Sequence, residues 1–172
     1  MAVGNRRVIA GVSGSVRSLA ALRAAVTEAR ISGAPLQAVL AWAPVGGELA
    51  YARAPCAALL EQWEQAACQR LLDAFDKAFG GMPRDVEISA AVVRAAPGPA
   101  LVELAGRPDD LLVVGYGGRG WLGRATHGAV TRYCIAHARC PVLTVPPPDL
   151  IQQMRRWRHQ WRPEDFIVPL AG

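Results

Sequence analysis

The sequence has little lysine, little histidine and no closely paired cysteines. Among its 172 residues it holds one lysine, Lys77, against 18 arginines, and its three histidines are scattered. The four cysteines include no C-x2-C pair, so the spacing typical of a zinc site is missing and no metal site is predicted. We expect the thiols to be buried and to behave as small hydrophobic side chains.

Long apolar runs are also missing, and no segment reaches the length that a membrane-spanning helix needs. The first residues, MAVGNRRVIAGV, lack the apolar core and the cleavage site of a signal peptide, so a cytoplasmic location is expected. Hydrophobic residues make up 52% of the chain, which favours a compact fold over disorder. A chain of this length is expected to form one main domain.

The net charge of +5 and the pI of about 9.5 come almost entirely from arginine. Such a bias suits phosphate-bearing ligands, and it would also suit nucleic acid. The basic residues are spread along the whole chain without a long run, however. Nucleic-acid binding is therefore the weaker of the two inferences.

Apolar segments alternate with helical patterns from residue 8 to residue 145. Strands are predicted at 8–12, 36–42, 86–92, 111–114 and 141–145, and helices in the intervals, including 57–79, 97–106 and 128–138. Residues 43–55 hold two prolines and two glycines and are predicted to be a loop, which either covers a ligand site or is only a connection.

This βαβαβαβαβ order favours an α/β, Rossmann-like fold with an open five-stranded parallel sheet, strand order 3-2-1-4-5, and helices on both faces. The strand at 86–92 is expected at one edge of the sheet, and the last strand at the other. Ligands bind such sheets outside the carboxyl ends of the strands, where the chain order reverses. The sequence therefore predicts a ligand site between Val12-Ser13 and Val114-Gly115.

The segment LLVVGYGGRGWLGRATHGAVTRYCIAHARCPVLTV, residues 111–145, is the most informative. After four buried-strand residues it continues into a loop with little side-chain bulk, and then into a helix with Val130, Cys134, Ile135 and Ala138 expected on its inner face. Such a helix start can receive an anion. No Asp or Glu occurs between Leu111 and Pro148, as an anion site requires. A glycine-rich connection of no function fits the loop pattern about equally well.

The glycine spacing narrows the choice. Gly115-x2-Gly118-x9-Gly128-Ala129 resembles the G-x2-G-x9-G-[Ser/Thr] nucleotide signature of the universal stress protein family, and residues 137–143 look like that family's approach to its last strand. The resemblance covers about residues 6–146. It is not a Walker loop, because no Gly-Lys-Ser/Thr follows the glycines, and it is not the dinucleotide fingerprint, which belongs on a first strand.

The resemblance implies a stress-responsive regulatory protein that binds ATP or a related adenine nucleotide and forms homodimers, often through the final strand. In family members that bind ATP, an Asp follows the first strand and a Ser or Thr follows the third glycine. Ser13 and Ala129 stand there in this sequence, so the site should be weakened rather than abolished, with Thr131 and Arg119 able to compensate. The resemblance places the nucleotide site at these residues: Val12, Ser13, Ala41, Val114, Gly115, Gly118, Arg119, Gly128, Ala129, Val130 and Thr131.

Two other functions remain open. A family member with a degenerate site could act through protein contacts, using residues 149–172, which follow the 1–148 domain and are predicted to form an amphipathic helical tail. That tail either docks on its own domain or contacts a partner, a second copy or an acidic membrane surface. An enzyme acting on a nucleotide ranks last, because His127 is the only histidine near the glycine loop and no carboxylate is local; no catalytic residue is predicted.

Overall fold

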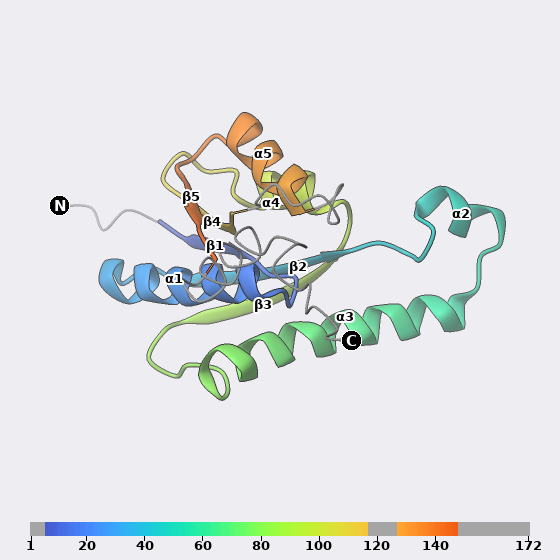
Figure 1. The fold of residues 1–172 in the computed structure, drawn as a ribbon, viewed down its shortest axis with the longest axis horizontal. Helices are drawn as coiled ribbons and strands as arrows, with labels where there is room; N and C mark the ends of the chain where they lie inside the picture. The colour runs from blue at the N-terminus through green and yellow to red at the C-terminus, as the bar shows by residue number, and fades with distance from the viewer. Residues whose placement is uncertain (1–5, 117–126, 148–172) are drawn as a thin grey trace, which may run out of the picture.

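The computed structural model describes residues 6–116 and 127–147, and its centre is one sheet of five parallel strands (Figure 1). The strands are β1 (Val8–Gly11), β2 (Leu36–Trp42), β3 (Ile88–Arg94), β4 (Leu111–Gly115) and β5 (Val142–Val145). Their order is β3-β2-β1-β4-β5 and all neighbours run parallel. The predicted fold class, strand order and edge positions of β3 and β5 are confirmed; pairing of two copies along β5 stays a prediction.

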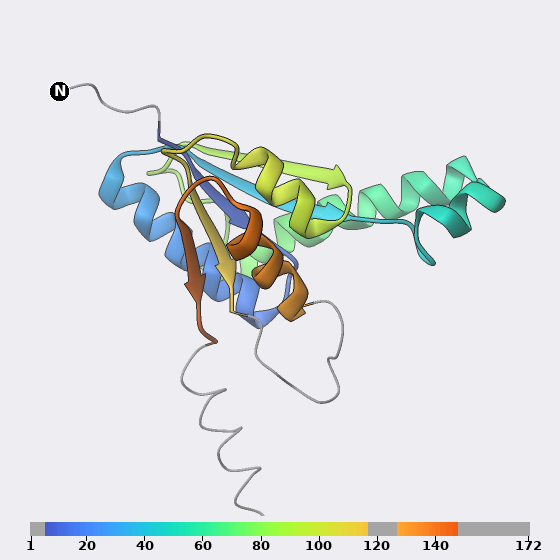
Figure 2. The same cartoon turned by 90° about the horizontal axis from the view of Figure 1, so that it is seen from above.

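Two layers of helices cover the two faces of the sheet. On one face lie α1 (Val16–Ser32) and α3 (Ala57–Phe79), and on the other lie α4 (Pro97–Leu104) and α5 (His127–His137) (Figures 1 and 2). Successive residues of a strand point to opposite faces, so Val8 and Ala10 join the α1/α3 core while Ile9 joins the α4/α5 core. Strands β1 and β4 are apolar throughout, as expected for strands whose two faces are both covered.

The helix α1 fills the interval between the first two strands, where a helix was predicted. Ser15 caps its start by accepting a hydrogen bond from the Ser18 backbone N–H, and Gly33 ends it with a φ of 65°, a left-handed conformation that favours glycine. Four residues at helical spacing bury the inner face against the sheet: Leu19, Leu22, Val26 and Ala29.

The predicted loop at residues 43–55 was wrong in part, because it contains a short helix, α2 (Glu48–Arg53). Long-range contacts hold this helix in place. Glu48 forms an ion pair of 2.6 Å with Arg94 at the end of β3, and the Tyr51 ring meets the Trp63 ring edge-on at 6.3 Å. Together with the first turns of α3, α2 projects beyond the sheet (Figure 2).

The strand β3 lies two residues later than predicted, because it pairs with all seven residues of β2 from Leu36↔Ile88 to Trp42↔Arg94. On α5, Ile135 was wrongly expected on the inner face and is 60% exposed.

The cysteines divide into two pairs. Cys134 and Cys140 are buried as predicted, whereas Cys56 and Cys68 are exposed, against the prediction, because they lie at the start and on the outer side of α3. Burial raises the pKa of Cys134 to about 11, so this thiol stays neutral.

The predicted tail helix at 149–172 and the domain boundary at 148 lie outside the described residues. Within the parts of the chain that are described, no helix has the length and apolar character needed to cross a membrane.

Candidate functional site

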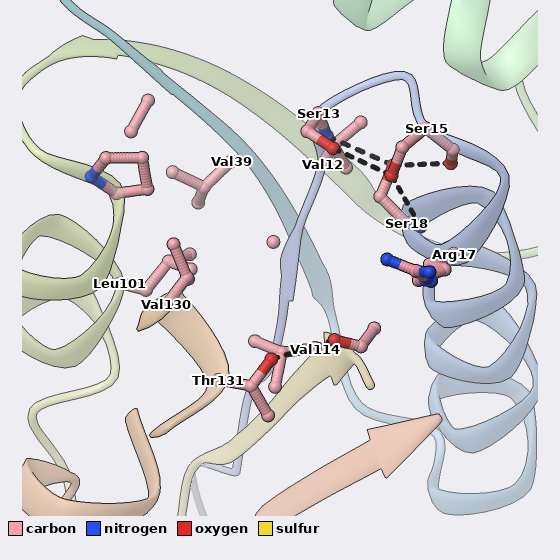
Figure 3. A pocket seen from close by; sticks show the side chains of 14 residues that line it. Val12, Ser13, Ser15, Arg17, Ser18, Val39, Leu101, Val114, Val130 and Thr131 are labelled. Atoms are coloured by element: carbon pink, nitrogen blue, oxygen red, sulfur yellow. Dashed lines mark hydrogen bonds between the residues drawn. The ribbon is translucent and has the colours of Figure 1, made fainter. Parts of the chain in front are cut away.

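A cavity of about 220 Å³ lies at the carboxyl ends of β1 and β4, where the sequence predicted a ligand site. The next described helices after these neighbouring strands pack on opposite faces of the sheet, α1 on one and α5 on the other. The divergence leaves a space between the two strand ends. Residues from β1, α1, β2, α4, β4 and α5 line it (Figure 3).

One wall of the cavity is apolar. Val39 from β2, Leu101 from α4 and Val130 from α5 lie together on that side (Figure 3). Leu101 can pack over the end of β1 because Gly11 has no side chain: a Cβ at Gly11 would lie 2.9 Å from the Leu101 Cδ1 atom. This wall suits a flat apolar ring.

The opposite wall is polar and comes from the turn between β1 and α1 (Figure 3). Ser18 Oγ donates to the Ser15 carbonyl at 2.9 Å and accepts from the Ser13 backbone N–H at 3.2 Å, while Ser13 Oγ donates to Ser15 Oγ at 3.1 Å. These bonds hold the turn in one shape. The Ser13 side chain is exposed, so its hydroxyl can still bond to a ligand.

Arg17, in the first turn of α1, is the charged member of the described lining, which includes no Asp or Glu. Its backbone lies against the end of β4, since a Cβ on Gly115 would be 2.7 Å from the Arg17 carbonyl oxygen. Only glycine allows this approach, and the approach brings the turn after β1 next to the start of the glycine loop. Among residues 6–116 and 127–147, no group of three or more His, Cys, Asp or Glu residues could hold a metal ion.

Thr131 links α5 to the same point. Its side chain is almost fully buried, and its hydroxyl donates a hydrogen bond of 2.9 Å to the Gly115 carbonyl. The hydroxyl proton is therefore engaged within the protein, although the oxygen can still accept a further bond. This hydrogen bond thus ties α5 to the end of β4 beside the cavity.

A family model described as the Universal stress protein family matches residues 4–146. The chain belongs to the universal stress protein family. A universal stress protein of Thermus aquaticus is 29% identical over 147 residues, which are 81% of this chain and 98% of the relative. A universal stress protein of Mycobacterium tuberculosis is 26% identical over 154 residues, 84% of this chain and 49% of the relative. The chain thus spans about half the length of the mycobacterial relatives that it matches.

Solved structures of the universal stress protein family agree with the fold. A universal stress protein in complex with cAMP is 30% identical with a TM-score of 0.52, over 84% of this chain and 98% of that one. UspA from Lactobacillus plantarum has a higher TM-score, 0.62, at 22% identity, over 82% of this chain and 97% of that one. The second likeness bears on the fold alone.

The structure brings together most of the residues that the family signature singled out. Seven of them line the cavity: Val12, Ser13, Ala41, Val114, Gly115, Val130 and Thr131. Gly128 and Ala129 lie in the first turn of α5, outside the described lining. Gly118 and Arg119 lie outside the described residues, as does the side chain of His127.

Sequence reasoning missed other members of the lining, chiefly Ser15, Arg17, Ser18, Val39 and Leu101. Some had a signal. Val39 lies two residues before Ala41 on the same face of β2, so the alternation of a strand could have found it. Ser15 could have been predicted from its place in the Ser13-Gly14-Ser15 turn directly after β1. Leu101 had no signal, because only the packing of α4 brings it to the end of β1.

Proposed function

We propose that this universal stress protein family member is a regulatory protein that binds ATP or a related adenine nucleotide in the cavity between β1 and β4. The observation that carries the proposal is the division of the cavity into an apolar wall and a hydroxyl-rich, positively charged wall. An adenine nucleotide has the same division, since a flat base is joined to a hydroxylated sugar and an anionic phosphate.

The residues can be matched to the parts of such a ligand. The base would lie against Val39, Leu101 and Val130, while the Ser13 hydroxyl would bond to the ribose. The phosphate would lie near Gly115, which contacts both the Arg17 backbone and Thr131 of α5. The first backbone N–H groups of a helix such as α5 have no partner within the helix and favour an anion. At about 220 Å³ the cavity is smaller than the roughly 300–1,000 Å³ of drug-sized ligand sites, which suits a base with its sugar.

The comparisons support the ligand class. The family structure that holds cAMP is 30% identical to this chain, and the match covers 98% of that structure's chain and 84% of this one. cAMP is an adenine nucleotide, and its base and ribose are those of ATP and AMP. The stress-responsive role is what membership of the family suggests.

Calorimetry on the purified chain with ATP, AMP and cAMP tests this function. We expect measurable heat with at least one of them, and mass spectrometry of material released on denaturation should find an adenine compound. Ala41→Phe should abolish the binding heat because Ala41 lines the cavity and a phenyl ring would fill it. Ala43→Phe, at an exposed position just after β2, is the matched control and should bind normally. No heat from the unaltered protein at millimolar nucleotide would overturn the proposal.

A further inference from the structure

Among the described arginines, Arg17 is the one that lines the cavity. Arg7, Arg30 and Arg94 each form an ion pair, with Asp110, Asp85 and Glu48, and Arg23 donates to the carbonyls of Lys77 and Ala78. In the part of the chain that the structure describes, Arg17 has neither an ion pair nor a side-chain hydrogen bond. It lines the cavity, and no carboxylate among the described lining residues balances its charge.

The position of Arg17 decides which part of a ligand it would meet. It lies in the first turn of α1, two residues after Ser15, and its carbonyl oxygen is held against Gly115. The side chain therefore starts between the serine turn and the start of the glycine loop. In Figure 3 it forms the side of the cavity across from Val39, Leu101 and Val130. A base against those three residues would have its sugar and first phosphate on the Arg17 side.

We propose that Arg17 binds the phosphate nearest the ribose and is the residue by which this site distinguishes adenine nucleotides from adenosine. The inference rests on the proposed adenine-binding function. A guanidinium presents its N–H groups in a planar fork that matches two phosphate oxygens, and such charge-assisted bonds are about twice as strong as neutral ones. Ser13 and Ala129 offer no charge, so Arg17 is the charged side chain of the described lining that attracts the phosphate. The ligand class is an adenosine phosphate, a class that includes AMP and cAMP.

Titration of the full chain with AMP and with adenosine tests this role. The unaltered protein should bind AMP about ten- to a hundredfold more tightly than adenosine, the range expected for a hydrogen bond to a charged group. Arg17→Gln should remove most of that difference while leaving adenosine affinity within about twofold, because uncharged parts of the ligand keep their contacts. Arg17→Lys, which keeps the charge without the planar fork, should retain part of the preference. Arg70→Gln removes the same charge from the exposed side of α3 and should change neither affinity.

The possible outcomes distinguish a failure of this inference from a failure of the proposed adenine-binding function. If the unaltered protein binds AMP and adenosine equally, Arg17 does not bind the phosphate and the inference is wrong, although the proposed adenine-binding function is retained. An equal loss of AMP and adenosine affinity in Arg17→Gln would show that the side chain only shapes the cavity, and would overturn the inference as well. If no adenine compound binds the unaltered protein, the site and the inference fall together.

Discussion

The two ends of the neighbouring strands β1 and β4 are built in opposite ways. Just before the strands begin, Arg7 and Asp110 form an ion pair with contacts of 3.0 and 2.7 Å, and Arg7 also donates to the Leu104 carbonyl. Just after the strands end, the chain separates around a cavity, and Arg17 faces that cavity without a carboxylate partner among the described residues.

The difference shows how one pair of strands can serve two purposes. At the amino end the protein supplies both charges itself, so the strands are joined, and no buried side-chain nitrogen or oxygen of the described residues lacks a hydrogen-bond partner. At the carboxyl end the described residues supply only the cation and leave space beside it. An anion that completes the second arrangement has to come from outside the described part of the chain, and a ligand phosphate is the anion that we propose.

Removing the Arg7–Asp110 ion pair at the amino end of β1 and β4 should have the largest effect, a loss of stability. Arg7→Met keeps the aliphatic stem but leaves the Asp110 side chain, which is 0% exposed, without its cation. We expect a loss of about 3 kcal/mol in the free energy of unfolding, the lower end for a broken buried pair because Arg7 is itself 27% exposed. Urea unfolding measures it. Arg6→Met, at the exposed neighbouring position, should change stability by less than about 0.5 kcal/mol, and equal effects of the two would contradict this account of the pair.

Acid should selectively weaken the contribution of the Arg7–Asp110 ion pair to stability. Burial raises the pKa of Asp110, but hydrogen bonds from the Arg7 side chain and the Arg107 backbone, with the nearby positive charges, outweigh it and the pKa lies below its ordinary value. A lowered folded-state pKa contributes stability above the unfolded value of about 3.9 and loses it as pH falls through the folded value. The stability difference between the unaltered protein and Asp110→Asn should therefore shrink below about pH 4. Urea midpoints from neutral pH to pH 3 check this, and a constant difference would count against it.

Adding a carboxylate beside Arg17, at the carboxyl ends of β1 and β4, should have the smallest effect. In Ser13→Asp, the new carboxylate would accept hydrogen bonds from the ribose and also compete with a phosphate for Arg17. Adenosine should bind several-fold more tightly, and the preference for AMP over adenosine should fall. Calorimetry with both ligands measures the ratio. Ser32→Asp, at the exposed end of α1, controls for the added charge, and an unchanged ratio in Ser13→Asp would argue that Arg17 and Ser13 do not share a ligand.

The sequence was sufficient for the sheet, because five apolar segments alternating with helical periods admit few arrangements other than a parallel α/β sheet. It was not sufficient for α2. That helix is six residues long, lies between a glycine and a proline, and depends on Glu48 meeting Arg94 from a distant strand. Local sequence patterns carry no information about such a contact.

The candidate site divides in the same way. The ends of β1 and β4 could be located from chain order alone, and the glycine spacing pointed to the same place. Arg17 and Leu101 could not be located, because periodicity tells which helix residues are buried and not which strand end they reach. Leu101 enters the cavity only because Gly11 lets α4 approach, a relation that appears once the two elements are packed.

The cavity has walls from both layers of helices, with Ser15 and Arg17 on the α1 side of the sheet and Leu101 and Val130 on the α4/α5 side. A bound molecule would touch both layers at once, which the sheet otherwise keeps apart. Its binding would then raise the free energy of local unfolding in either layer, by the same mass-action linkage through which a ligand raises global stability. Amide hydrogen exchange would slow in α1 and α4 together, so that ligand occupancy couples two halves of the molecule.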